Sequence, residues 1–278
     1  MSECLGLRHV TPDALPALLP QVQAGALLGV VVEGWLDEAA LDLLNARLDA
    51  DAAFPRTPLY GFDDHPRPPF LYGRSVVDCA ADLSDYFPAA RRFRAACAGL
   101  FEGLAPFEDH LADTLAALAG VPAGLATGPG GAPYTPATIR ELPDGQQIGL
   151  HIGNAFLCTP QAADLARQVQ VGAQLSFFTT LRRPAGGGRL LVYDLRWEQV
   201  SAWYRSGKVD VRRVPADAVA LIGLADQVVL DPPPGALLVF DGGRYFHRVV
   251  PVEGPIARRT LGGFAAWTND GAALRYWG

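Results

Sequence analysis

The sequence has few residues of the kinds that build disulfide-bonded, zinc-binding or nucleic-acid-binding proteins. Its four cysteines are widely spaced among 278 residues and form no Cys-x-x-Cys pair, so we expect reduced thiols rather than a disulfide scaffold or a structural zinc site. It has one lysine, Lys208, and 23 basic against 29 acidic residues, which gives a net charge of −6. Because a phosphate surface requires a basic face, we expect neither a nucleic-acid partner nor an anionic membrane partner.

Long hydrophobic runs are also lacking. The longest, residues 24–32, falls well short of the roughly 20 apolar residues that cross a bilayer. The opening residues, MSECLGLRHV, contain an acidic residue and no apolar core followed by small residues, so we expect no signal peptide and a cytoplasmic protein. Half of the residues are hydrophobic and 19% are charged, a balance typical of folded globular chains.

The residue pattern changes near position 130, at the Gly- and Pro-rich segment 126–133. Before this point the spacing of apolar residues predicts one buried strand and three helices. The strand covers residues 24–33, and the helices cover residues 37–51, 90–104 and 107–119. Residues 54–78 contain five prolines and therefore predict a long ordered loop rather than a regular helix.

After residue 133, short strand-like segments alternate with Gly- and Pro-containing turns. They cover residues 134–141, 146–151, 173–181, 188–194, 227–230, 236–240, 245–250 and 259–267. About eight strands at this spacing predict a jelly roll. We therefore expect an α+β fold in one domain, 1–278: a helix-rich N-terminal part and lid, 1–130, packed on a double-stranded β-helix (cupin-like) core, 131–278.

Two of the five histidines lie where strands of a jelly roll can meet. His151 ends a predicted strand in GLHIGNAF, and His247 follows a strand and turn in GGRYFHRVV. If these strands are neighbours, both imidazoles can bind one metal ion; otherwise each is an ordinary hydrogen-bonded residue of the core or rim. The choice between these two interpretations depends on the residues around the second histidine.

Arg258 and Thr260 stand on the strand after His247, two residues apart and thus on one face of the strand. A guanidinium beside a hydroxyl suits the distal carboxylate of a ligand, although Arg258 alone would fit a solvated surface ion pair equally well. The ordered set of a PGxLLxF segment, a histidine and an RxT triplet is typical of the iron/2-oxoglutarate oxygenase site.

Non-haem iron oxygenases bind Fe(II) with two histidines and one carboxylate, which normally stands two residues after the first histidine. Here that position is Gly153, which has no ligand atom. Two alternatives stay open: the site is degenerate and binds no iron, or an exogenous anion fills the gap. Chloride fits because it carries the same charge as the missing carboxylate. Asp194, reaching in from another strand, is a third and less favoured alternative.

Three sequence blocks carry a family resemblance: TGPGGAPYTPATIRELPDGQQIGLHIGNAFL (127–157), QLSFFTTLRRPAGGGRLLVYDLRWE (174–198) and PGALLVFDGGRYFHRVVPVEGPIARRTLGGF (234–264). With weaker similarity from about residue 70, the chain resembles the iron(II)/2-oxoglutarate-dependent halogenases of hapalindole- and welwitindolinone-type indole alkaloid biosynthesis. The resemblance implies chlorination or bromination of an unactivated aliphatic carbon in a free-standing small molecule, coupled to oxidative decarboxylation of 2-oxoglutarate to succinate and CO2. Fe(II), 2-oxoglutarate, chloride or bromide and O2 are thereby implied, and a carrier protein is not expected.

The resemblance also implies roles for individual residues. It implies that iron is bound by His151 and His247, that Gly153 leaves room for halide, and that 2-oxoglutarate is bound by Arg258 with support from Thr260. The cosubstrate or halide pocket would be lined by Tyr134, Thr135 and Arg140, and Ser176 would bias the reaction toward halogenation over hydroxylation. The substrate pocket would be lined by Tyr72, Val77, Ile148 and Phe156. For the last four residues, plain core packing is an equal alternative.

The chain departs from this family in the segment before the predicted pocket, where Arg74, Ser75 and the proline-rich residues 65–70 stand. If that segment is a lid over the pocket, we expect the accepted substrate to differ from that of the family.

Two other functions are open: a hydroxylase or desaturase of the same fold, with water or another anion in the gap, and a non-catalytic jelly-roll binding protein with a relic metal pocket. The relic predicts no iron retention and no succinate, and the hydroxylase predicts succinate without halogenated product.

Overall fold

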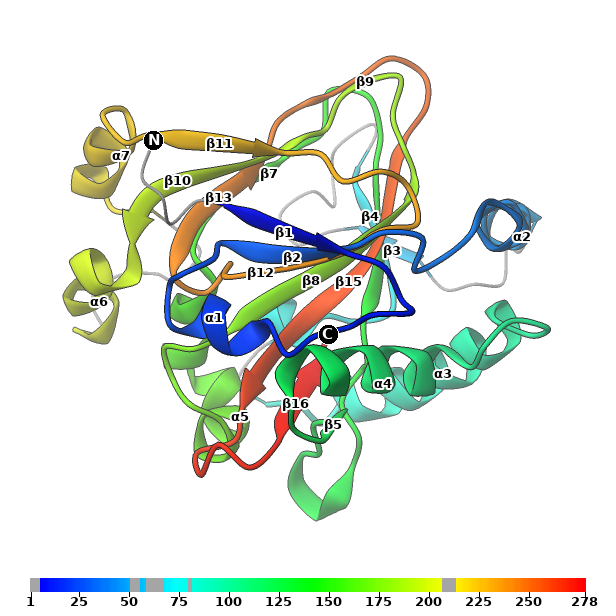
Figure 1. The fold of residues 1–278 in the computed structure, drawn as a ribbon, viewed down its shortest axis with the longest axis horizontal. Coiled ribbons are helices and arrows are strands. Elements are labelled where there is room, and N and C mark those ends of the chain that lie inside the picture. The colour runs from blue at the N-terminus through cyan, green and yellow to red at the C-terminus, as the bar shows by residue number, and fades with distance from the viewer. Residues whose placement is uncertain (1–5, 51–55, 59–67, 80–81, 207–213) are drawn as a thin grey trace.

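Two β-sheets face each other in the computed structural model, which describes residues 6–50, 56–58, 68–79, 82–206 and 214–278 (Figure 1). Within these residues the large sheet has ten strands, in the order β1 (Leu7–Val10), β2 (Gly29–Val32), β12 (Leu237–Phe240), β8 (Leu175–Arg182), β15 (Arg258–Trp267), β6 (Thr138–Leu142), β4 (Phe70–Tyr72) and β3 (Arg56–Pro58), with β16 (Leu274–Trp277) beside β15 and β5 (Ala123–Leu125) beside β16.

The small sheet faces the middle of the large one. Its four described strands run in the order β11 (Gln227–Leu230), β10 (Leu190–Arg196), β13 (Tyr245–Val249) and β7 (Ile148–His151). A short pair, β9 (Gly186–Gly187) and β14 (Val252–Glu253), lies at one end. All pairings within the small sheet are antiparallel, so hairpin turns and longer crossovers bring strands from distant parts of the chain together.

Alternating side chains give the large sheet two apolar faces. Leu238 and Phe240 point toward the small sheet and pack with Val192 between the two sheets. Phe177 and Val239 point the other way, into a second cluster with the helices. The large sheet is therefore buried on both sides, which explains why its strands read as nearly continuous apolar runs.

Helices cover the outer faces of both sheets. The outer face of the large sheet is covered by α1 (Leu19–Gln23), α2 (Glu38–Ala50), α3 (Tyr86–Leu100) and α4 (Phe107–Ala119). The remaining helices are α5 (Ala163–Gln168), α6 (Trp197–Arg205) and α7 (Ala216–Ile222), together with the short 3₁₀ turns η2 (Val76–Asp78), η3 (Pro129–Gly131), η4 (Gly153–Cys158) and η5 (Pro160–Ala162).

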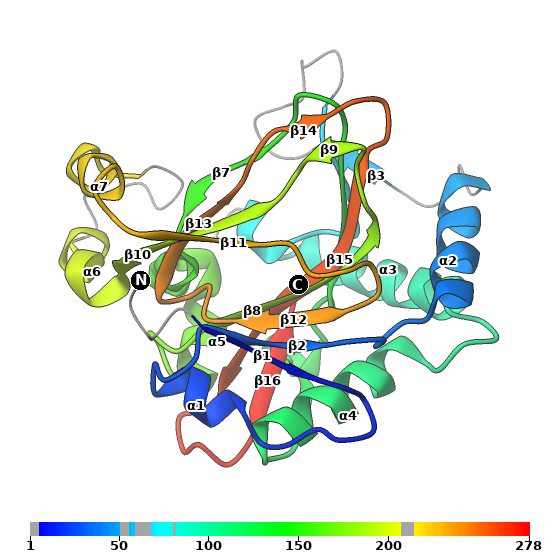
Figure 2. The ribbon, with the colours of Figure 1, turned by 45° about the horizontal axis from the view of Figure 1, so that its top comes forward.

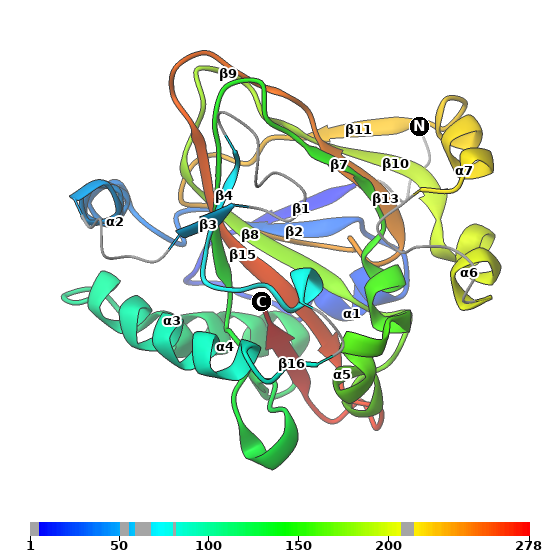
Figure 3. The ribbon, with the colours of Figure 1, turned by 180° about the vertical axis from the view of Figure 1, so that it is seen from behind.

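The views agree on where the helices lie. Figure 3 shows α3 and α4 beneath the large sheet, and Figure 2 shows α6 and α7 together at the far end of the small sheet. Residues of α6 and α7 form one cluster with Tyr193 and Phe246 of the small sheet. No helix in the described ranges is long and apolar enough to cross a membrane.

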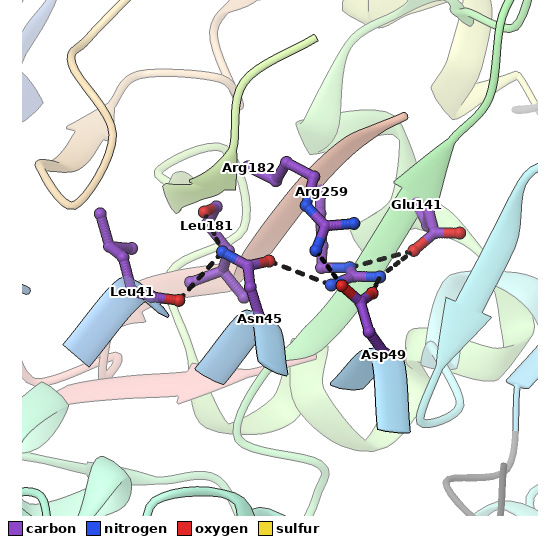
Figure 4. A network of polar contacts seen from close by, with 7 residues as sticks. All are labelled: Leu41, Asn45, Asp49, Glu141, Leu181, Arg182 and Arg259. Carbon is purple, nitrogen blue, oxygen red and sulfur yellow. Dashed lines mark hydrogen bonds and ion pairs between the residues drawn. The ribbon is translucent and has the colours of Figure 1, made fainter. Parts of the chain in front are cut away.

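A polar network fixes α2 to the large sheet (Figure 4). Arg259 is 3% exposed at its side chain and donates to Glu141 at 2.5 and 3.0 Å. It also donates to Asn45 at 3.0 Å and to Asp49 at 2.9 Å, and Arg182 binds the other oxygen of Asp49. Because neighbouring residues of a strand face opposite ways, Arg259 serves this outer network while Arg258 faces the interior.

Most predicted elements are present, with shifted ends. The helices at 37–51 and 107–119 correspond to α2 and α4, but the helix predicted at 90–104 is α3, which begins at Tyr86 and ends at Leu100. The strand predicted at 24–33 is confined to β2. The prediction of a loop throughout residues 54–78 is wrong, because β4 pairs there with β6, a long-range contact that no local pattern reports.

The strand predicted at 134–141 begins only at Thr138. Tyr134 instead packs against Tyr86 and Phe87, with its ring centroid 5.5 and 5.3 Å from theirs.

The division of the chain at residue 130 is also less sharp than expected. Strands β1, β2 and β4 come from the N-terminal part and join the large sheet.

Candidate active site

His151 and His247 lie side by side on the small sheet. They are direct partners across β7 and β13, and their ring centroids are 4.1 Å apart. The ring of His247 also meets Phe240 of the large sheet edge to face at 5.2 Å, which places the pair between the two sheets. The structure thus brings together the two histidines that the sequence analysis selected, although they are far apart in the sequence.

Each imidazole is held by a carbonyl two residues earlier in its own strand. Nδ1 of His151 donates to the Gly149 carbonyl at 2.8 Å, and Nδ1 of His247 donates to the Tyr245 carbonyl at 3.0 Å. A proton on Nδ1 leaves the Nε2 lone pair of each neutral ring free to bind a metal ion. Such a bond from the second ring nitrogen is the usual support of a metal-binding histidine.

The surroundings keep both rings neutral. Burial is the main cause that lowers the pKa of His151 to about 4, with a smaller contribution from the charge of Arg140. Burial also holds the pKa of His247 well below its usual value, and neighbouring His151 and Arg140 lower it further. At neutral pH the pair is therefore two uncharged nitrogen ligands, the form in which histidine binds metal ions.

No carboxylate of the described residues completes the pair. Among the residues that the structure describes, no group of three or more His, Cys, Asp and Glu side chains could hold a metal ion. Asp194, the alternative raised by the sequence, is bound to Arg196 at 2.9 Å. Asp241, a buried carboxyl on the turn after β12, accepts the Arg244 backbone N–H at 3.0 Å and lies 3.3 Å from its guanidinium.

Gly153 opens η4 and packs tightly against two other segments. Its N–H donates to the Gly242 carbonyl at 2.8 Å. A Cβ placed on Gly153 would lie 2.4 Å from Nε2 of Gln174 and 3.0 Å from the Gly242 carbonyl oxygen. The position expected to hold a metal-binding carboxylate is therefore closed to any side chain unless its neighbours move.

Two buried polar side chains next to this point have no partner among the described residues. Ser176 and Gln174 are 8% and 0% exposed. The Ser176 hydroxyl and both polar atoms of the Gln174 amide make no hydrogen bond within the described chain. Ser176 was predicted from the resemblance, whereas the sequence analysis missed Gln174. The available signal was its position two residues before Ser176, which puts both on one face of the chain.

The basic residues lie on the large sheet, on the face turned toward the histidines. Thr260 is the direct partner of Arg140 on β6 and of Thr180 on β8, and Arg258 stands two residues before it on the same face of β15. Nε of Arg140 is buried and has no partner among the described residues. Burial, followed by the charge of Arg140, lowers the pKa of Arg258 to about 10, so the Arg258 guanidinium stays charged at neutral pH.

Arg258 also borders a cavity of about 200 Å³. Phe178 and Thr180, from the same inner face, line it with Arg183, Arg189 and Asp231. The Arg258 guanidinium lies 5.4 Å from the centre of the Phe178 ring. The inner face of the large sheet thus combines two cations, two hydroxyls and a little free space, which suits an organic anion.

Tyr134 and Thr135 lie in the segment before β6, and Tyr134 belongs to the same hydrophobic cluster as Phe156. The Thr135 N–H donates to the Tyr86 hydroxyl at 3.0 Å, and that hydroxyl donates to the carbonyl of Gly278 at 2.9 Å. The Thr135 hydroxyl donates to the Arg74 carbonyl. These contacts tie α3, the segment before β6 and the last residue together, and they account for Thr135. The buried hydroxyl of Tyr134, by contrast, has no hydrogen-bond partner among the described residues.

The four predicted substrate residues do not form one group. Phe156 belongs to a hydrophobic cluster that Val77 packs against. Tyr72 is buried in the cluster beneath the large sheet, and Ile148 packs at the edge of the cluster between the sheets. The predicted lid, residues 65–70, lies mostly outside the described residues. Of the cysteines, Cys79, Cys97 and Cys158 carry free thiols, and Cys4 is outside the described part.

Comparison with known proteins gives one family match. The model of the family described as carrier-protein-independent halogenase WelO5 matches residues 7–278. No curated protein matches the chain. Several solved structures are similar in fold at low sequence identity.

One is an N-substituted L-amino acid dioxygenase from Burkholderia ambifaria AMMD, with 17% identity, a TM-score of 0.54, and coverage of 94% of this chain and 90% of that one. Its complex with α-ketoglutarate is similar with a TM-score of 0.53, at the same identity and coverage. EctD from S. alaskensis, in its apoform, has 14% identity and a TM-score of 0.51, over 97% of this chain and 85% of that one. These likenesses confirm the predicted α+β fold with an oxygenase-type jelly roll.

Proposed function

The chain belongs to the carrier-protein-independent halogenase WelO5 family and is therefore an oxidoreductase; on this premise we propose that it chlorinates or brominates an unactivated aliphatic carbon of a free-standing small molecule. The observation that carries the proposal is the pair of neutral histidines beside a glycine, with no carboxylate joining them in the described residues. A hydroxylase of the same fold needs no such gap.

The residues present fit an Fe(II) ion. His151 and His247 would hold it through Nε2, because each Nδ1 is occupied by a carbonyl and both rings are uncharged. When bound, Fe(II) and 2-oxoglutarate would supply the O2-dependent oxidation, with succinate and CO2 as products. A halide ion would take the place of the carboxylate that Gly153 lacks, which keeps the charge of a two-histidine, one-carboxylate site.

The inner face of the large sheet would bind the cosubstrate. Arg258 and Thr260 are placed to hold the distal carboxylate of 2-oxoglutarate, since a guanidinium and a hydroxyl share one face of β15. Arg140, one strand away, adds a second positive charge that stabilises an organic anion there. Thr135 would then support α3 and the C-terminal residue. Tyr134, whose buried hydroxyl has no partner among the described residues and which shares a cluster with Phe156, stays a proposed pocket residue.

Ser176 would bias the reaction toward halogenation over hydroxylation. Its hydroxyl is buried, has no partner among the described residues and lies on the face of β8 that points to the small sheet. There the hydroxyl would offer a hydrogen bond on the metal side of the site, and its contribution would be one of orientation.

The substrate that we propose is an indole alkaloid or a similar apolar natural product. Phe156 and Val77 share one hydrophobic cluster and are the best-supported contacts; Tyr72 and Ile148 complete the proposed set from neighbouring clusters. A free substrate, rather than one bound to a carrier protein, agrees with the description of the family.

The test is to supply Fe(II), 2-oxoglutarate, O2 and chloride with a panel of indole alkaloids, and to measure succinate and product mass. We expect succinate together with a chlorinated product, and more hydroxylated product from Gly153→Asp. Succinate with only hydroxylated or desaturated product would favour the oxygenase alternative. A protein that retains no iron and forms no succinate would favour the binding protein.

A further inference from the structure

Gln174 has a buried amide whose hydrogen-bonding groups the protein does not use. It is 0% exposed, and neither its Nε2 nor its Oε1 has a partner among the described residues. The backbone of Gln174, by contrast, is fixed: its N–H donates to Asn154 Oδ1 at 3.1 Å, and its carbonyl accepts from Gly243 at 3.0 Å. A buried amide without partners destabilises the folded state unless a ligand satisfies it.

The amide lies at the vacant ligand position. Its nitrogen would be 2.4 Å from a Cβ on Gly153, so it stands where the first side-chain atom of a metal-binding aspartate would be. Ser176, on the same face two residues later, has an unpartnered hydroxyl that would be 2.4 Å from a Cβ on Gly242. Two neutral donors therefore stand next to the place where the carboxylate of related oxygenases would be.

The charges around this position favour an anion. The positive charge of Arg140 acts on both histidines, and its buried Nε has no partner among the described residues. The buried carboxyl of Asp241, the residue before Gly242, is engaged with Arg244. An anion at the metal would meet N–H and O–H donors here rather than a competing carboxylate from the described residues.

We propose that Gln174 binds the halide, with its side-chain N–H donating to the ion held beside Gly153. The inference rests on the proposed function and deepens it by naming the residue that binds the halide at the position where related enzymes have a carboxylate. Gln174 fills the space that a side chain at position 153 would need and offers a donor to the ion that replaces that side chain.

The test uses the whole protein with Fe(II) and 2-oxoglutarate under anaerobic conditions, and chloride is titrated while the metal-to-ligand charge-transfer band is recorded. Gln174→Met keeps an unbranched side chain of similar size without the donor, and Gln174→Glu keeps the shape but places a carboxylate beside the ion. We expect the apparent Kd for chloride to rise about tenfold or more in Gln174→Met, as loss of a hydrogen bond to a charged group predicts. In Gln174→Glu we expect the chloride response to disappear.

Gln170→Leu is the matched control. Gln170 lies in the same loop, but the protein itself satisfies its amide, which bonds to Gln23 and to the Thr268 carbonyl. Its chloride affinity should stay within about twofold of the parent, since no hydrogen bond to the halide is lost. Thermal unfolding of each apoprotein establishes that the variants are folded before titration.

The outcomes separate this inference from the proposed function. If chloride shifts the band of the parent and Gln174→Met binds chloride equally well, the role of Gln174 is wrong and the proposed function stands. If the parent band ignores chloride, the halogenase proposal fails and the halide role fails with it. If Gln174→Met loses Fe(II) without chloride present, the amide is a metal ligand and the inference is also overturned.

Discussion

Replacing Gly153 by alanine tests the tight packing at the vacant position. The added Cβ would lie 2.4 Å from Gln174 Nε2 and 3.0 Å from the Gly242 carbonyl oxygen. One contact is with the end of a flexible side chain and the other with backbone, so the amide must turn inside a fully buried site. Overpacking of this kind lowers the free energy of unfolding by about 1–3 kcal/mol.

The assay is equilibrium urea unfolding of the apoprotein, with Gly149→Ala as the control. A Cβ on Gly149 meets nothing within 4 Å, although Gly149 lies on the same strand as His151, so this variant should stay within about 0.5 kcal/mol of the parent. The variant Gln174→Ala removes the nearer collision. In Gly153→Ala/Gln174→Ala we therefore expect a coupling energy of about 1 kcal/mol or more between the two substitutions.

Two results would refute this reasoning. One is a Gly153→Ala protein as stable as the parent, which would mean that the position is open. The other is strict additivity of the two substitutions, which would mean that the Gln174 amide does not stand against Gly153.

Three further predictions concern the surrounding charges. Arg258→Leu should weaken 2-oxoglutarate binding about tenfold to a hundredfold while Fe(II) binding is kept, as equilibrium dialysis can measure. The pKa of His151 is about 4 in the folded state and about 6.5 in the unfolded state, so the unfolded chain binds a proton first as the pH falls. The free energy of unfolding of the apoprotein should therefore decrease as the pH drops from about 6.5 to about 4. A urea midpoint whose pH dependence is the same in His151→Leu as in the parent would contradict this. Arg259→Leu leaves the partly buried Glu141 unpaired and should cost about 3 kcal/mol in urea unfolding, whereas Arg167→Ala, at an exposed ion pair, should cost under about 1 kcal/mol.

The spacing of short strands and turns predicted the jelly roll, and the resemblance of three sequence blocks predicted the family and a shared site for His151 and His247. The sequence could not predict the role of Gln174, which depends on how close the chain at Gly153 comes to another segment in space. It also missed β4, since that strand is defined by its pairing with β6 and not by its proline-rich surroundings. Tyr134 was assigned to a strand because aromatic and threonine residues favour strands, whereas packing against α3 places it before β6.

Arg258 and Arg259 show the same division between local and long-range information. The alternation of a strand correctly separates their faces, and the RxT spacing indicates an anion site for the first. Nothing in the sequence near Arg259 indicates that Asn45 and Asp49 of α2 bind it, because that contact joins residues more than 200 positions apart.

The central claim is that two neutral histidines hold Fe(II) and leave one position for a halide. X-ray absorption at the iron edge tests it most directly, on anaerobic protein with Fe(II), 2-oxoglutarate and bromide. The account predicts one bromine scatterer bound to iron in the parent and none in Gly153→Asp. An iron site with only nitrogen and oxygen neighbours in the parent, at saturating bromide, would contradict it.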